Sequence, residues 1–281
     1  MGSNFVILYR FDGLCARVLS SQPDVVAPGL NILAAWSPMG GGMGLTYNIV
    51  SGTSMSCPHV AGVSALLRSA HRDWSPAMIR SALMTTAYTT DNVGSTLSDT
   101  YTGGTSNAWG YGAGHIDPNA ALEPGLVYDI STQNYVDFIC GLNYTGHALD
   151  TYTTFVAEKC TSPTPNFYRP IDLNYPSFSV FFNETSDVRP FTVTTARTLT
   201  NVGPLLSSPT IYTLVALREP THLNVFVTPT ILTFDYLNRH LSYNVTFTSN
   251  VTKTNYVSFG SLTWSDGIHK VTSPISFIIS A

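Results

Sequence analysis

The stretch SGTSMSCPHVAGVSALLRSAH, residues 51–71, constrains the fold more than any other part of the chain. A strand-like run, LTYNIV, precedes it and ends at Gly52, and a helix is predicted to follow from about Pro58. Apolar residues lie nearly all round this helix, which is typical of a helix buried in a domain core. The run DWSPAMIRSALMTTA predicts a second helix with Ser75 as N-cap and Pro76 as its first residue. Together these elements indicate an α/β domain, in which helices flank a parallel sheet.

Ser54 lies at the turn from the strand into the first helix. The N-terminus of a helix has backbone N–H groups without intrahelical partners and carries partial positive charge, which suits a developing oxyanion. Gly52 allows a tight turn, and the small neighbours leave room for a substrate. Ser54 is therefore a candidate nucleophile, although a lone serine before a helix is more often a simple N-cap.

The composition limits the classes of function. The chain has 281 residues, enough for one large or two ordinary domains, and 44% of them are hydrophobic. A net charge of −4 argues against a nucleic-acid partner, and the apolar runs are too short to span a membrane. Asp117, Asp129 and Asp137 do not have the spacing of a calcium loop, so neither a metal nor another cofactor is expected.

The second half of the chain has a different pattern. From about Asn174, apolar and polar residues alternate in short β-branched runs separated by turn residues. The run SLTWSDGIHKV predicts a hairpin in which Asp266 and Gly267 take the left-handed turn positions. Several such strands indicate an antiparallel β-sandwich. We therefore expect an α/β domain over residues 1–140, a connecting segment over 141–173 and a sandwich over 174–281.

Longer motifs carry a resemblance to a known family. SGTSMSCPHVAG resembles the nucleophile signature G-T-S-M-x-x-P-H-V-A/S-G of the subtilisin-like serine proteases, or subtilases. PDVVAPGLNILAAWS and GYGAGHIDPNAALEPGLVYD resemble the segments before and after that signature in the plant, cucumisin-type branch. DLNYPSFSV, RTLTNVG, YNVTFT and FGSLTWSDGIHKVTSPI resemble the fibronectin-III-like domain of the same branch. The resemblance implies the C-terminal portion of a subtilisin-type peptidase domain, followed by a fibronectin-III-like sandwich.

The resemblance implies a mechanism of acyl transfer. Ser54 would attack a peptide carbonyl, a histidine would accept its proton, and an aspartate would orient that histidine. The Ser54 backbone N–H and an asparagine side chain would stabilise the oxyanion. The residues implied to support the nucleophile turn are Gly52, Thr53, Met55, Pro58 and His59, the last two as structural residues of the first helical turn.

The partners of Ser54 are missing from the expected positions. Subtilases run in the order Asp, His, Asn, Ser, and the residues before Ser54 resemble none of the first three motifs. His59 belongs to the nucleophile signature, His71 ends the helix and His115 matches a family segment that we interpret as structural. We expect no substitute base, and a serine without its base loses nearly all of the rate that the triad supplies. The chain alone is therefore expected to be inactive.

Two kinds of residue bear on the compartment. A disulfide between Cys140 and Cys160 is expected if the compartment is oxidising, whereas Cys57 is interpreted as an inert thiol. The first residues lack the long apolar run of a signal peptide, so either the chain is cytosolic or a preceding part is absent. The sequons and the resemblance favour an extracellular glycoprotein, with accidental sequons in a Thr-rich chain as the alternative. The sequon asparagines are Asn143, Asn183, Asn244 and Asn250.

Three functional hypotheses follow. The first is a secreted serine endopeptidase that acts on polypeptide substrates through Ser54. The second is a truncated, inactive subtilase remnant that acts at most as a binding module. A purely structural β-sandwich module is the third, and it leaves residues 1–140 unexplained. A homodimer formed through the β-sandwich is a further expectation.

Overall fold

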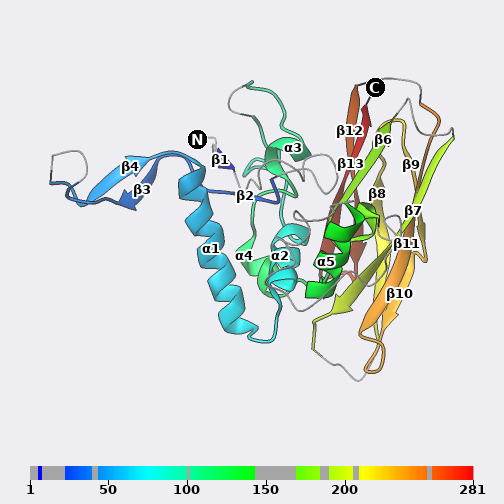
Figure 1. Ribbon diagram of the computed structural model, residues 1–281. Coiled ribbons are helices and arrows are strands. Elements are labelled where there is room, and N and C mark those ends of the chain that lie inside the picture. The colour runs from blue at the N-terminus through cyan, green and yellow to red at the C-terminus, as the bar shows by residue number, and fades with distance from the viewer. Residues whose placement is uncertain are drawn as a thin grey trace.

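The computed structural model describes residues 6–7, 23–39, 44–99, 102–142, 169–183, 190–204, 209–251 and 255–280. Helices and short strands from the first half of the chain lie beside a β-sandwich built from the second half (Figure 1). The elements of the first half are β1 (Val6–Ile7), β2 (Val26–Ala27), β3 (Ile32–Ala35), β4 (Tyr47–Val50), α1 (Thr53–Ala70), α2 (Pro76–Thr85), α3 (Ala108–Tyr111), α4 (Pro118–Leu122), β5 (Leu126–Val127) and α5 (Thr132–Gly141).

Two sheets form the sandwich. One has the strand order β10-β8-β12-β13-β6, and the other has the order β5-β7-β11-β9. All neighbouring strands are antiparallel except β6 and β13, which are parallel. The elements of this half are η2 (Pro170–Asp172), β6 (Phe178–Asn183), β7 (Phe191–Asn201), β8 (Thr210–Arg218), β9 (Asn224–Thr228), β10 (Ile231–Phe234), β11 (His240–Ser249), β12 (Tyr256–Ser265) and β13 (Lys270–Ser280).

The alternation in the sequence correctly predicts the inward faces of these strands. Every second residue of β9, and of β11 from Tyr243 onward, is buried, because successive side chains of a strand point to opposite faces. The predicted hairpin is β12 and β13, closed by the pair Ser265 and Lys270. Of its two predicted turn residues, Gly267 alone has a positive φ, of 96°. Asp266 instead accepts hydrogen bonds from the N–H groups of Ile268 and His269.

The strand before the nucleophile turn differs from the prediction. We expected it in a parallel sheet, but β4 pairs antiparallel with β3. The connection between Ala35 and Tyr47 is shorter than the crossover that parallel neighbours need, so the chain turns back as a hairpin. This hairpin projects away from the other elements (Figure 1), and Leu33 and Ile49 are exposed on it. In the described part of the first half, parallel pairing is confined to a single bridge between Val26 and His115.

The two halves are joined through β5. Leu126 pairs with Asn201, and Val127 pairs with Thr200, so β5 is an edge strand of the second sheet. Tyr128 follows β5 into the sandwich core, where its Oη forms hydrogen bonds with Tyr243 Oη at 2.7 Å and Ser273 Oγ at 2.8 Å. A residue of the first half therefore links the two sheets of the sandwich.

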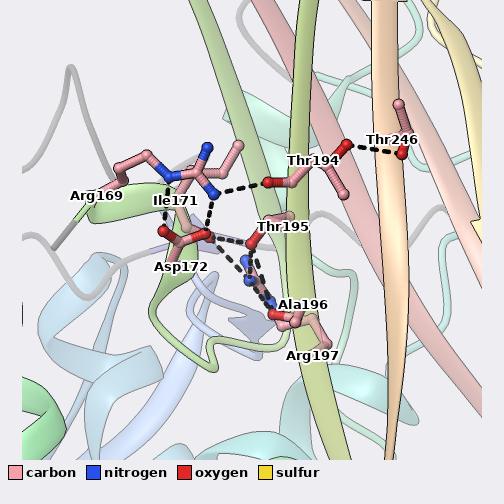
Figure 2. A network of polar contacts seen from close by, with 8 residues as sticks. All are labelled: Arg169, Ile171, Asp172, Thr194, Thr195, Ala196, Arg197 and Thr246. Carbon is pink, nitrogen blue, oxygen red and sulfur yellow. Dashed lines mark hydrogen bonds and ion pairs between the residues drawn. The ribbon is translucent and has the colours of Figure 1, made fainter. Parts of the chain in front are cut away.

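A buried arginine fixes the chain where it enters the sandwich. Arg197, on β7, is only 3% exposed, and its guanidinium donates to the carbonyl oxygens of Ile171 at 2.8 Å and Tyr175 at 3.1 Å. It also donates to Thr195 Oγ1 at 2.9 Å, and Figure 2 shows this cluster beside Asp172. A buried charge is tolerated only where it is well hydrogen-bonded, so Arg197 holds the η2 segment firmly against β7.

Candidate functional site: the turn into α1

The helix of the nucleophile turn begins earlier than the sequence predicts. Gly52 is its N-cap, and α1 starts at Thr53 rather than near Pro58. Ser54 is therefore the second residue of the helix, and Pro58 lies in its interior rather than in its first turn. Because proline has no N–H, it cannot donate the usual helical hydrogen bond to the carbonyl oxygen of Ser54, four residues before.

The backbone at this turn leaves N–H groups available. Gly52 adopts a φ of 155°, which glycine reaches without strain, and its N–H donates to Gly29 O at 2.7 Å. The N–H groups of Met55 and Ser56 donate to Gly52 O. Helix geometry gives the N–H groups of Thr53 and Ser54 no intrahelical acceptor. Ser54 itself is exposed, so a carbonyl oxygen could approach both its side chain and these N–H groups.

A hydrogen bond anchors the first turn of α1 to β2. The hydroxyl of Ser56 is buried and donates to Ala27 O at 3.0 Å, and Ala27 is fully buried. β2 is held in turn by Val26, whose N–H donates to Gly114 O at 2.8 Å and whose carbonyl accepts from Ile116 N at 3.0 Å. The position of Ser54 thus depends on contacts formed two residues further along the helix.

Asp24, just before β2, is the centre of a contact between the two halves. Tyr175 Oη donates to Asp24 Oδ1 at 2.5 Å, and Arg80 Nε lies 3.9 Å from Asp24 Oδ2. Burial, and then the negative charge of Asp24, raise the pKa of Tyr175 well above its usual value, so the phenol stays protonated and donates. None of these three residues could be recognised as a site from the sequence, because no local motif marks a contact between positions so far apart.

The described histidines have other partners than Ser54. The ring of His59 donates to Met55 O at 2.7 Å within α1, and the ring of His71 donates to Leu122 O at 2.8 Å. His115 donates to Ile116 O at 2.9 Å, and burial lowers the pKa of its ring. In the sandwich, His240 bonds to Thr200 and His269 to Asp266, while the ring of His222 packs edge-on against Tyr256. His147 lies outside the described residues.

α1 is less buried than the sequence predicts. Within this helix, Ser56 and Leu67 are the fully buried residues, whereas Leu66 is 68% exposed. The reason is that the described elements that contact α1, among them α2, α4 and β2, leave much of its apolar surface uncovered. A groove of about 620 Å³ runs between α1 and α2, and Val60, Ala61, Ala65, Ile79 and Leu83 contribute apolar side chains to it.

Some of the remaining predicted site residues lie in the described part of the chain, and others lie outside it. Cys57 is a free, half-buried cysteine, and Cys140 is disulfide-bonded, while Cys160 lies outside the described residues. Asn244 and Asn250 are exposed. Asn143 and the side chain of Asn183 also fall outside the described part.

Two other kinds of site are absent from the described residues. These residues hold no group of three or more histidine, cysteine, aspartate or glutamate side chains arranged to bind a metal ion. No helix in the described part of the chain is long and apolar enough to cross a membrane.

Comparisons with known proteins give a match for each half of the chain. Residues 11–112 match the subtilase family, and residues 172–277 match a fibronectin type-III domain. Two Arabidopsis thaliana proteins, subtilisin-like proteases SBT1.7 and SBT1.5, are 44% and 45% identical over 91% and 90% of this chain. Subtilisin-like protease Glyma18g48580 of Glycine max is 40% identical over 91% of the chain. The chain spans about a third of the length of these relatives, 33%, 33% and 32% respectively.

Solved structures show weaker similarity. The VesB protease of Vibrio cholerae is 17% identical with a TM-score of 0.24, covering 36% of this chain and 30% of that one. A FixG-related protein of Vibrio parahaemolyticus is 10% identical with a TM-score of 0.26, covering 33% of this chain and 82% of that one. Similarity at this level says nothing of activity.

Proposed function

Because the chain belongs to the plant-type subtilisin-like proteases of the subtilase family, we propose that it carries the nucleophile of a serine endopeptidase, Ser54. The observation that supports this role most directly is the position of Ser54, which is exposed in the first turn of α1. The N–H groups of that turn point along the helix axis toward the space before it, where an oxyanion would be stabilised.

The proposed reaction is hydrolysis of a peptide bond in a polypeptide substrate. Ser54 Oγ attacks the carbonyl carbon while a histidine takes its proton, and that histidine later protonates the leaving amine. An aspartate orients the histidine, and the Ser54 N–H with an asparagine amide holds the oxyanion. In this proposal Gly52, Thr53 and Met55 shape the turn, and Pro58 and His59 support the helix behind it.

We place the histidine, aspartate and asparagine in a part of the protein outside these 281 residues. Two observations support this: the described histidines bond elsewhere, and the relatives are about three times as long as this chain. The exposed faces of α1 and of the β3–β4 hairpin are where the rest of a subtilisin-type domain, with its parallel sheet, would pack. On its own the chain is proposed to be inactive.

The proposed domain organisation follows from the same premise. The peptidase portion covers residues 1–140, a connecting segment covers 141–173, and the fibronectin-III-like sandwich covers 174–281.

We further propose an extracellular location, which the disulfide at Cys140 supports because disulfides persist in oxidising compartments. A homodimer would use the outer face of β8 and β10, where Ile211, Val215 and Ile231 are exposed; its test is sedimentation of the secreted protein.

A fluorophosphonate probe tests the role of Ser54. We expect no labelling of the 281-residue chain and labelling of a longer chain that includes the upstream aspartate, histidine and asparagine motifs. Ser54→Ala should abolish that labelling, whereas Ser69→Ala, which changes an exposed serine near the other end of α1, should not. Labelling that persists in Ser54→Ala would show that the nucleophile is another residue.

The second candidate function is an inactive subtilase remnant that acts as a binding module. It is favoured by the engagement of the described histidines with partners other than Ser54. If the longer chain also fails to react with the probe while folding cooperatively, this second function replaces the first.

A further inference from the structure

The outward face of the second sheet is rich in hydroxyl groups. Thr194 on β7 and Thr246 on β11 form a cross-strand hydrogen bond at 2.8 Å, seen at the upper right of Figure 2. Thr198 and Ser242 form an equivalent bond at 2.8 Å. Side chains on β9 complete this face, and among them Phe226 is 70% exposed. Its exposed aromatic ring offers an apolar surface on this otherwise polar face, against which a substituent attached nearby could pack.

Asn244 stands in the middle of the same face. It lies on β11 between Ala196 on β7 and Thr228 on β9, and its side chain is exposed. The small Ala196 leaves space beside it. Phe226 is the direct partner of Thr246, and is therefore the diagonal neighbour of Asn244. Diagonal neighbours on one sheet face lie within about 7–8 Å, within reach of a large substituent.

We propose that Asn244 carries an N-linked glycan whose first sugar covers the ring of Phe226. The residues Asn244, Val245 and Thr246 form an acceptor sequon, and in the described part of the chain it is the one sequon with all three residues placed. A pyranose ring has one face of C–H groups, and that face packs against an aromatic ring and removes apolar surface from water. The inference rests on the secretory route proposed above.

The modification is a transfer from a lipid-linked oligosaccharide in the secretory pathway. The amide nitrogen of Asn244 forms a bond to the anomeric carbon of the sugar and loses a proton. The bond from that carbon to the pyrophosphate oxygen breaks, and the lipid pyrophosphate leaves. The Thr246 hydroxyl is required when the sequon is recognised, before folding, and afterwards bonds to Thr194.

An attached glycan also restricts how this protein associates. A glycan at the centre of the β7–β11–β9 face would keep a second protein from packing there. It leaves open the outer face of β8 and β10, the surface named above for the homodimer.

Peptide mapping of the full chain, secreted from a eukaryotic host, tests the modification. We expect Asn244 to be occupied, Thr246→Ser to retain the glycan, and Thr246→Val and Asn244→Gln to lose it. An unoccupied Asn244 would overturn the proposal, whether the other sequons are occupied or not. Occupancy should be identical in Ser54→Ala, so the outcome is independent of the proposed nucleophile.

Thermal unfolding with and without amidase treatment tests the contact with Phe226. Removal of the glycan should lower Tm by on the order of 2 °C in the unaltered chain and by less than half of that in Phe226→Ser. The matched control is Ile231→Ser, which changes an exposed apolar residue on the other sheet and should leave the effect of deglycosylation unchanged. Equal losses in the unaltered chain and in Phe226→Ser would show that the sugar does not cover the ring.

Discussion

Tyr175 Oη donates a hydrogen bond of 2.5 Å to Asp24 Oδ1, and this bond ties the fibronectin type-III region to the strand that anchors the first turn of α1, where Ser54 lies. Tyr175 is positioned from the sandwich side by Arg197, which binds its carbonyl oxygen. Asp24 immediately precedes the strand whose Ala27 carbonyl accepts from Ser56. A continuous set of contacts therefore runs from β7 of the sandwich to the first turn of α1.

Tyr175→Phe should destabilise the chain by about 1–3 kcal/mol, because the partly buried carboxylate of Asp24 loses the hydrogen bond from the buried Tyr175 hydroxyl. Urea unfolding measures the loss. Hydrogen exchange should also be faster in the first turn of α1 than in the unaltered chain. Tyr236→Phe, which changes an exposed tyrosine in the turn after β10, should change neither the stability of the chain nor the hydrogen-exchange rate in the first turn of α1. Faster exchange spread evenly over α1 would contradict the proposed route through Asp24 and Ala27.

Tyr128→Phe should cost about 1–3 kcal/mol, since it removes the buried hydroxyl that bonds to Tyr243 and Ser273. A sharper test compares two fragments that end at the same residue. One beginning at Pro124 keeps β5 and Tyr128, and one beginning at Arg169 lacks both but keeps η2 and its bonds to Arg197. The shorter fragment should be less stable by roughly 3 kcal/mol or more, because a large aromatic residue leaves the core. Equal stability would show that the sandwich is complete without β5.

Gly112→Ala should be far more damaging than Gly103→Ala. Both glycines have similar positive φ values, 64° and 69°, so both alanines suffer the same backbone strain of about 1–2 kcal/mol. A Cβ at position 112 would also lie 2.1 Å from Pro23 O, whereas one at position 103 would meet no atom within 4 Å. We expect a loss of roughly 3 kcal/mol or more at position 112, measured by denaturant unfolding. Similar losses at the two positions would rule out the close approach.

His115 should make stability depend on pH. Burial lowers the pKa of its ring in the folded chain below the ordinary 6.5, despite the hydrogen bond to Ile116 O and the nearby charge of Asp117. The unfolded chain then binds more protons, so stability falls as the pH drops below about 6.5 and levels off below the folded pKa. His115→Gln should flatten this part of the stability profile. An unchanged slope would show that other groups cause it.

Features that depend only on residues a few positions apart were predicted correctly from the sequence. The N-cap role of Ser75, with Pro76 starting α2, was predicted correctly because an N-cap needs only its own side chain and the N–H groups of the next turn. The strands of the sandwich were predicted because burial alternates with the pleat of each strand. Gly267 was placed correctly in the β12–β13 turn, since it takes the positive φ there.

The start of α1 was predicted five residues too late. Proline commonly marks a first turn, but here Pro58 lies within the helix, which begins after Gly52. The pattern of the preceding strand could not show its partner either. Apolar alternation reveals which face of a strand is buried, but the direction of a neighbouring strand depends on how the chain between them is routed.

By itself, the sequence determined the order of the two regions, the resemblance of the motif around Ser54 to a subtilase signature, and the buried pattern of the strands. Only the tertiary structure decided that β5 joins the sandwich, that Tyr175 reaches Asp24 and that Phe226 lies diagonal to Asn244. The physical reason is the distance along the chain. Turns, caps and pleats are set by neighbours a few residues apart, whereas these contacts join positions brought together by packing of the whole core.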